Sequence, residues 1–232
     1  QFIFLSTTAI YEGPYEAGSF DERTIPDWKK RDYAGGKLEA EKICLDFAGS
    51  HDLPVTILRP TIVYGPFAPS WTIFPVELIR KGVLKEFDDF AGICNPVYVD
   101  DVVGAILASI NNENAFNDVF NVSSGETISW HDFFTGYSLA VSGKPLEKSN
   151  RFAYTGSYIA VSAVKKSVKF VFSLAPDFTK NVYRYLRSKD LGNWSWVKGE
   201  DISNVDLGFY NKRLEFRIDK LKEKLSGLIK AL

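Results

Sequence analysis

The sequence predicts a parallel α/β domain over residues 1–145, followed by a smaller, mostly helical lobe over residues 146–232. Short continuous apolar runs such as Phe2-Ile3-Phe4-Leu5 are typical of parallel strands that are buried on both faces. These runs alternate with helix-like segments through the first domain, as they do in strand–helix–strand units. After Pro145 the alternation weakens, and aromatic and basic residues become frequent.

Local signals place the first elements in order. Residues 33–48 are expected to form a helix because apolar residues recur on one face, and Gly49 is expected to end it. Pro54 introduces a second buried strand over residues 55–58. Arg59-Pro60 should end that strand, since proline has no N–H for the sheet ladder.

The remaining elements follow from the same kinds of signal. The segment 11–32, rich in Gly, Pro and acidic residues, is expected to be a loop. The other expected elements are helices over 74–81, 101–110 with Asp100 as N-cap, and 130–142 ended by Gly143; strands over 97–99 and 119–122; helical stretches near 157–172 and 178–188; an edge strand over 214–218; and a helix from Asp219 to about Leu232.

Composition and charge limit the class of function. Apolar residues make up 45% of the chain and charged residues 25%, which is ordinary for a globular protein. Lys plus Arg (28) nearly cancels Asp plus Glu (29), so no bulk charge attracts a nucleic acid or an anionic membrane. No apolar run approaches the roughly 18 residues of a membrane helix. We therefore expect no membrane partner, and the overall charge disfavours a nucleic acid without excluding a local basic patch that binds one.

The cysteines and histidines argue against a metal site or a disulfide framework. Cys44 and Cys94 are too few to staple a chain of this length, so we expect free thiols in the cytoplasm. With His51 and His131 as the two histidines, a zinc site is not expected.

Tyr33 and Lys37 are four residues apart on a predicted helix, so both project from one face. A free tyrosine titrates at about 10, and an ammonium one turn away favours the phenolate, which brings the pKa toward that of a useful base. Tyr185 and Lys189 repeat the spacing. The pair alone therefore indicates little, and its sequence context has to distinguish it.

The context of Tyr33 consists of two strand ends that carry hydroxyl groups. Ser6-Thr7-Thr8 follows the first predicted strand, and Arg59-Pro60-Thr61 follows the second. Open α/β sheets bind their ligands at the carboxyl ends of parallel strands. The sequence therefore predicts a ligand site at this edge of the sheet, and Tyr185 has no such neighbours.

The ordered set of motifs resembles the extended short-chain dehydrogenase/reductase family, which contains nucleotide-sugar epimerases and dehydratases. The matching motifs are a strand ending in Ser/Thr before Tyr11, Tyr33-x-x-x-Lys37, Arg59-Pro60-x-x-Val63-Tyr64-Gly65-Pro66, and Val97-x-Val99-Asp100-Asp101. The resemblance implies a Rossmann-type fold, NAD or NADP as cofactor, a nucleotide-sugar substrate and a homodimer. Residues 1–145 would be the C-terminal half of the cofactor domain, and residues 146–232 a substrate-binding lobe.

Position by position, the resemblance implies a catalytic triad of Thr7, Tyr33 and Lys37, with Thr8 as the alternative to Thr7. Tyr33 would exchange the proton of the substrate hydroxyl. Lys37 would lower the pKa of that tyrosine.

The same resemblance implies cofactor contacts. Tyr33 and Lys37 would face the nicotinamide ribose, and backbone groups around Pro60, Thr61 and Val63 would hold the nicotinamide carboxamide.

Three further observations limit the resemblance or leave alternatives to it open. A glycine-rich strand–turn–helix is absent, so we expect an N-terminal portion of about 100 residues before Gln1. Ile62 falls where many nucleotide-sugar enzymes have an asparagine, which leaves a carbonyl reductase of the same family as an alternative. The basic and aromatic residues of 151–190 leave a non-catalytic RNA- or nucleotide-binding protein on the same fold as another.

Overall fold

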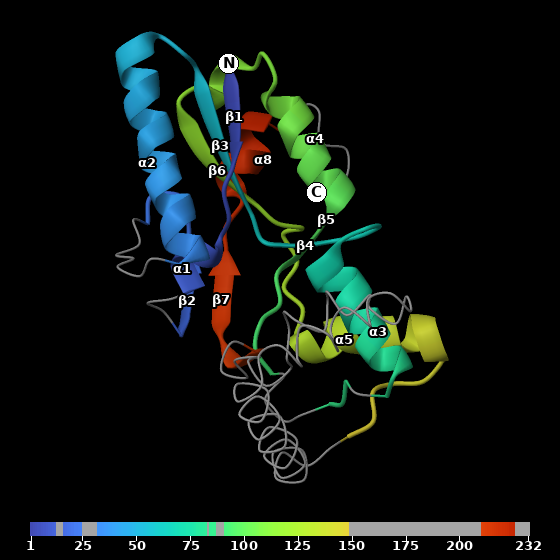
Figure 1. The fold of residues 1–232 in the computed structure, drawn as a ribbon. Helices are drawn as coiled ribbons and strands as arrows, with labels where there is room; N and C mark the ends of the chain where they lie inside the picture. Colours follow the sequence, from blue (N-terminus) through green and yellow to red (C-terminus); the bar gives the residue numbers. More distant parts are fainter. Residues whose placement is uncertain (13–15, 25–31, 83, 87–90, 149–209, 226–232) are drawn as a thin grey trace, which may run out of the picture. The chain divides into compact units, whose positions relative to one another are not determined.

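The computed structural model describes residues 1–12, 16–24, 32–82, 84–86, 91–148 and 210–225. The chain divides into two compact units, Gln1–Leu146 with Gly208–Leu232, and Glu147–Leu207. The described elements (Figure 1) are β1 (Phe2–Leu5), α1 (Ala9–Glu12), β2 (Ala17–Phe20), α2 (Tyr33–His51), β3 (Val55–Pro60), β4 (Ile62–Tyr64), the π-helix η1 (Pro69–Ile73), α3 (Phe74–Arg80), β5 (Pro96–Tyr98), α4 (Val99–Ser109), the 3₁₀-helix η2 (Glu113–Ala115), β6 (Asp118–Val122), α5 (Trp130–Ser142), β7 (Arg213–Phe216) and α8 (Asp219–Leu225). The helices expected over 157–172 and 178–188 lie outside the described residues.

A parallel sheet forms the centre of the first unit, which confirms the predicted fold class. Its strand order is β1-β3-β6. The register pairs Leu5 with Leu58 and Pro60 with Val122, so the carboxyl ends of the strands meet at one edge. Pro60 belongs to β3, two residues beyond the predicted end. The missing N–H of Pro60 removes one donor, but its carbonyl oxygen still accepts a hydrogen bond from the backbone N–H of Thr8.

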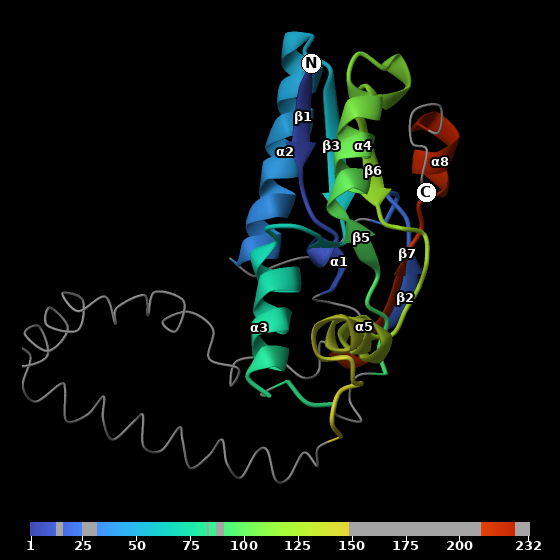
Figure 2. The same ribbon diagram turned by 90° about the vertical axis from the view of Figure 1, so that its right-hand side faces the viewer.

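Helices cover both faces of this sheet (Figure 2). α2 lies on one face, where Ala48 shares a buried cluster with Val55 and Ile57. α4 and α8 lie on the other face, where Val102 and Leu221 belong to the largest buried cluster. Cover on both faces explains why β3, whose six residues are all buried, is rich in apolar residues, whereas Phe2 and Leu5 of β1 are 46% and 40% exposed.

Two further parallel strand pairs adjoin the central sheet, β4 with β5 and β2 with β7. β7 is the predicted edge strand, shifted by one residue at its start. The sequence does not predict β2, which lies inside the segment expected to be a loop. Three of its four residues are exposed and Phe20 is buried, so no apolar periodicity marks this strand.

α5 begins and ends at the predicted residues. Ser129 and Asp132 form a reciprocal capping box, and Gly143 ends the helix in the left-handed conformation at φ 70°. α2 instead continues through Gly49 to His51. Its C-cap is Asp52, whose φ of 49° is left-handed. Short polar residues tolerate this conformation, so the predicted glycine stop is wrong.

The start of α4 also differs from the prediction. The N-cap is Tyr98, so Asp100 and Asp101 lie within the first turn. Carboxylates in the first turn interact favourably with the helix dipole without capping it. None of the described helices combines the length and hydropathy needed to cross a membrane.

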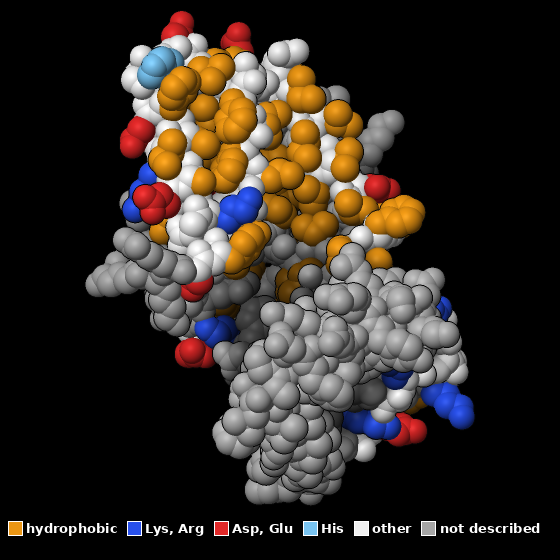
Figure 3. Space-filling view, viewed as in Figure 1, with side chains coloured by type: hydrophobic (Ala, Val, Ile, Leu, Met, Phe, Trp, Pro, Cys, Tyr) orange, Lys and Arg blue, Asp and Glu red, His pale blue; other side chains and the backbone are white. Residues whose placement is uncertain are grey.

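One edge of β1 carries no strand among the described residues, since β1 pairs with β3 alone. Figure 3 shows apolar side chains gathered over α2, β1 and α4 beside this edge. The β1 apolar face comprises Phe2 and Leu5 of β1, Ile43 and Phe47 of α2, Val103 and Leu107 of α4, and Ile110 directly after α4. A contiguous exposed apolar surface of this kind is typical of a site that further polypeptide covers.

Candidate functional site

The carboxyl ends of β1 and β3 form the framework of the candidate site. The backbone N–H of Ser6 donates to the carbonyl oxygen of Leu58 at 2.7 Å, and the N–H of Thr8 donates to that of Pro60 at 3.0 Å. α1 begins at the next residue. Ser6, Thr7 and Thr8 are therefore held at the edge of the sheet where ligands bind in open parallel folds.

Thr7 and Thr8 use their hydroxyl groups differently. The Thr7 oxygen accepts a hydrogen bond from the backbone N–H of Ala9 at 3.1 Å, which leaves its own proton available. Thr8 is 2% exposed, and its hydroxyl donates to the carbonyl oxygen of Pro60 at 3.4 Å. Of the two, Thr7 has the hydroxyl that can donate to a ligand.

Tyr33 is the first residue of α2. The Asp32 carboxylate caps this helix by accepting a hydrogen bond from the backbone N–H of Gly35 at 3.0 Å. Tyr33 is 66% exposed, so its phenol is open to an incoming molecule.

Lys37 lies one turn further along α2. Its ammonium donates to the carbonyl oxygen of Leu5 at 2.8 Å, and it lies 5.0 Å from the centroid of the Phe4 ring. The same Nζ is 6.0 Å from the centroid of the Tyr33 ring. The structure thus brings Tyr33 and Lys37 together with the strand end that leads into Thr7.

The predicted cofactor contacts Pro60, Thr61 and Val63 follow the end of β3. Both the backbone N–H and the hydroxyl of Thr61 donate to the carbonyl oxygen of Val122, at 3.0 and 3.3 Å. Val63 lies in β4, in register with Val97 of β5. A ligand at this segment would therefore have to use backbone groups other than the Thr61 N–H.

A buried polar network, which the sequence does not reveal as functional, lies behind the site. The guanidinium of Arg59 binds the Glu41 carboxylate twice, through Nε at 2.9 Å and Nη2 at 2.6 Å. Its Nη1 donates to the phenolic oxygen of Tyr11. The signal that could have found the network is the position of Glu41, one helical turn after Lys37 on the same helix.

Tyr11 differs from Tyr33 in its environment. Tyr11 is fully buried, and its hydroxyl lies 3.3 Å from the carbonyl oxygen of Asp21 and 3.5 Å from Oδ1 of Asn121. Burial raises the pKa of Tyr11 to about 12, although the adjacent Arg59 guanidinium opposes that rise. Tyr11 therefore keeps its proton at neutral pH and is not a general base.

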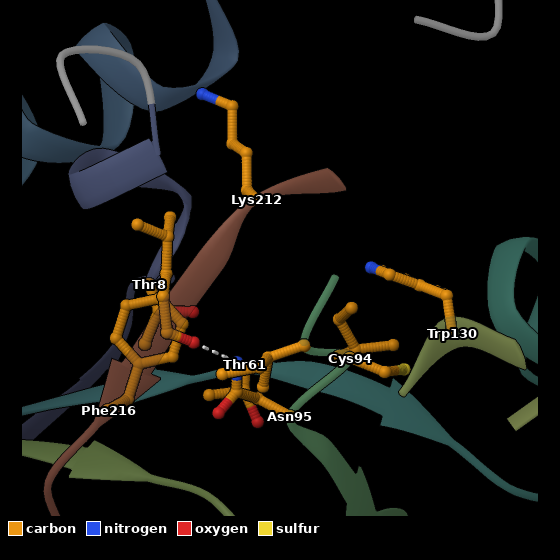
Figure 4. A pocket seen from close by; sticks show the side chains of 10 residues that line it. Thr8, Thr61, Cys94, Asn95, Trp130, Lys212 and Phe216 are labelled. Atoms are coloured by element: carbon orange, nitrogen blue, oxygen red, sulfur yellow. Dashed lines mark hydrogen bonds between the residues drawn. The ribbon is translucent and has the colours of Figure 1, made fainter. Parts of the chain in front are cut away.

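A pocket lies beside this framework (Figure 4). It is lined by Thr8, Thr61, Ile62, Ile93, Cys94, Asn95, Trp130, Lys212, Leu214 and Phe216. The Asn95 side-chain amide donates to the carbonyl oxygen of Leu214 at 2.6 Å, drawn as a dashed line in Figure 4, so this loop and β7 form one wall. Burial raises the pKa of the Cys94 thiol, which keeps it un-ionised. Among the described residues, no group of three or more His, Cys, Asp or Glu side chains could hold a metal ion.

Comparison with known proteins gives several relatives, including three 4-epimerases. The chain is 30% identical over 145 residues to the UDP-glucose 4-epimerase of Vibrio cholerae. The matched region covers 61% of this chain and 43% of that protein. The structure of UDP-glucose 4-epimerase from Thermotoga maritima, solved with UDP-glucose, matches with a TM-score of 0.53 at 29% identity, over 65% of this chain and 50% of that one. UDP-glucuronic acid 4-epimerase from Bacillus cereus, solved with NAD, shares the fold with a TM-score of 0.55 at 24% identity, over 64% and 48% of the two chains.

The chain spans about half the length of these relatives. A family model described as the NAD dependent epimerase/dehydratase family matches residues 1–123, which is more than half of the chain. That match covers β1 to β6, including the segments of Thr7, Tyr33, Lys37 and Arg59. The chain belongs to the NAD dependent epimerase/dehydratase family.

Proposed function

We propose that the protein is an NAD(P)-dependent epimerase or dehydratase that acts on a nucleotide-activated sugar. The observation that carries the proposal is the placement of the Lys37 ammonium. It lies beside the Tyr33 ring and donates a hydrogen bond to the carbonyl oxygen of Leu5 at the end of β1. The family description names NAD, and the relatives from Vibrio cholerae and Thermotoga maritima are UDP-glucose 4-epimerases, which supports both cofactor and substrate class.

Polar groups at the sheet edge fit the nicotinamide and ribose end of such a cofactor. The Ser6 hydroxyl is buried and has no hydrogen-bond partner among the described residues. The Thr7 proton is available, and Lys37 uses one of its three N–H donors on Leu5. Unsatisfied polar groups at one edge are what a polar ligand would complete.

The pyrophosphate end of the cofactor needs a different element. The 232 residues contain no glycine-rich Gly-x-Gly-x-x-Gly turn that could cradle phosphates. We propose that polypeptide outside these residues supplies it and packs against the β1 apolar face.

The proposed chemistry assigns one task to each side chain. NAD, when bound, would accept a hydride and return it. Tyr33 would accept the proton of a sugar hydroxyl on its phenolic oxygen, where the exposed end of α2 leaves room for a substrate. The positive charge of Lys37 would favour the phenolate. The Thr7 hydroxyl would donate a hydrogen bond to the reacting oxygen of the substrate and so orient the substrate.

The complete protein should convert a nucleotide sugar such as UDP-glucose without net consumption of NAD, as followed by NMR of the sugar and absorbance of the nicotinamide. Absence of turnover across a panel of nucleotide sugars would count against the proposal.

A carbonyl reductase of the same family is the second candidate. Ile62 favours it, because this residue is 9% exposed and lines the pocket with an apolar surface. A reductase consumes one NAD(P)H per product, whereas an epimerase recycles its cofactor. Stoichiometric loss of NAD(P)H absorbance with a carbonyl substrate would favour the reductase.

The homodimer and the cytoplasmic location remain predictions. Sedimentation of the complete protein should give a dimer at micromolar concentration, and a monomer there would contradict that assignment.

A further inference from the structure

A buried ionic network joins the chain segments that carry the candidate site, and we propose that its central residue, Arg59, is a positioning residue for the reaction put forward above. The inference rests on that proposed function. Arg59 would contact neither substrate nor cofactor. With Glu41 and Tyr11, it would fix Tyr33 and Lys37 relative to the end of β1.

The hydrogen bonds of Arg59 fix the orientation of its guanidinium. Its Nε and Nη2 donate hydrogen bonds of 2.9 and 2.6 Å to the two oxygens of the Glu41 carboxylate, and its Nη1 donates to Tyr11. The Arg59 and Glu41 side chains are 7% and 3% exposed, so water does not compete for these bonds. A planar fork engaged in this way has one orientation, unlike the point charge of a lysine.

Each arm of the network ends close in sequence to a candidate site residue. Glu41 follows Lys37 by one turn of α2, or about 6 Å along the helix. Tyr11 lies in α1, four residues after Thr7. Arg59 itself is the penultimate residue of β3. The three segments that must meet at the site are therefore tied to one guanidinium.

Lys37 and Glu41 both link α2 to the sheet, Lys37 through Leu5 and Glu41 through Arg59. The other buried residues of α2 are Ala34, Leu38 and Ala48, which are apolar. Apolar contacts favour packing of the helix on the sheet, but the hydrophobic effect is non-directional and does not favour one orientation of the helix. The polar links are thus the features that set the axial position and rotation of the helix that carries Tyr33.

Tyr11 gives the network a fixed third point. Its ring lies 5.7 Å from that of Phe20 and 5.8 Å from that of Phe216, measured between centroids. Burial lowers the pKa of Arg59, but hydrogen bonds and charge from Glu41 outweigh burial and raise it, so the guanidinium stays charged.

Stability and positioning can be separated experimentally. Replacing both partners of a buried ion pair by apolar residues is often neutral or stabilising, whereas removing one partner leaves a buried charge. The test variant is therefore the double substitution Arg59→Leu/Glu41→Leu in the complete protein, with Arg59→Lys as the conservative variant. Asp118→Asn is the matched control, because it removes an ion-pair partner at the amino end of β6, away from the site.

The double variant should melt within a few degrees of the wild type, yet show kcat lowered by at least about tenfold with KM within about threefold. The pH profile of kcat should also change, because Lys37 is no longer held beside Tyr33. Arg59→Lys should change kcat and its pH profile in the same direction by smaller amounts. Asp118→Asn should leave kcat and its pH profile at wild-type values.

Amide hydrogen exchange supplies a readout that needs no turnover. In the double variant, exchange in residues 6–11 and 33–37 should accelerate by at least about tenfold without a matching change elsewhere. If the wild type turns over no nucleotide sugar, the proposed function fails, and the exchange data alone decide on the positioning role. Wild-type exchange in both segments, or wild-type kcat and pH profile in a folded double variant, would overturn the inference.

Discussion

The ammonium of Lys37 donates a hydrogen bond of 2.8 Å to the backbone carbonyl oxygen of Leu5. This contact ties the first turns of α2 to the last residue of β1. Because Ser6 and Thr7 follow directly, a lysine predicted to act on a tyrosine is also anchored beside the predicted hydroxyl. The same bond leaves two N–H donors of Lys37 for a cofactor ribose or the Tyr33 phenolate.

Replacing Lys37 by methionine keeps the length of the side chain and removes its charge and its donors. Turnover should fall by at least about 100-fold, since the phenolate loses its counter-charge. Affinity for NAD should fall as well, because the same ammonium would bind the ribose. Steady-state kinetics and NAD titration measure the two effects. A variant with wild-type turnover would contradict the role of Lys37.

Thr7→Val should lower turnover by about tenfold or more and leave NAD affinity nearly unchanged, because its free hydroxyl would face the substrate. Thr8→Val should act mainly on stability, by about 1 kcal/mol, because the Thr8 hydroxyl is buried against Pro60. Comparing kcat with urea unfolding in both variants distinguishes them. If Thr8→Val lost more turnover than Thr7→Val, the alternative Thr8 would be the catalytic hydroxyl.

Asp118 makes stability depend on pH. Burial raises the pKa of Asp118, but hydrogen bonds from Lys220 and Lys224 outweigh burial and hold the pKa below its usual value. A carboxyl whose pKa is lower in the folded state stabilises the fold above its unfolded pKa and loses that contribution as the pH falls through the folded value.

Asp118→Asn should therefore cost about 1 kcal/mol of unfolding free energy at pH 7, and the difference should shrink as the pH falls below about 4. Urea unfolding at both pH values measures this. Asp46→Asn, at an exposed carboxylate of α2, is the control and should change stability by less than about 0.5 kcal/mol at either pH. A cost for Asp118→Asn that does not change with pH would contradict the linkage.

The sequence predicts the central α/β elements because their burial leaves a pattern. Residues 55–58 are all buried and read as a mostly apolar run, in which Thr56 is the one polar residue. Likewise, Gly143 ends α5 where the backbone has to turn left-handed. The sequence misses β2, because its backbone pairs with β7 while its side chains stay mostly exposed.

In the candidate site, too, local patterns can be read from the sequence, whereas contacts between distant residues cannot. The four-residue spacing of Tyr33 and Lys37 predicts that they share one helix face, and the order of the surrounding motifs distinguishes them from Tyr185 and Lys189. The contacts of Arg59 with Glu41 and Tyr11 join residues 18 and 48 positions apart in the chain. No local pattern specifies such pairs, since they exist only once α1, α2 and β3 have packed.

The most direct measurement of the central claim is turnover by Tyr33→Phe beside Tyr185→Phe in the complete protein. Tyr33→Phe removes the phenolic oxygen of an exposed ring, so turnover should fall by at least about 100-fold while the unfolding free energy changes little. Tyr185 has the same spacing to Lys189 but lies outside the described residues, and Tyr185→Phe should keep wild-type turnover. Near-wild-type turnover in Tyr33→Phe, with a loss in Tyr185→Phe, would contradict the assignment of Tyr33 as the base.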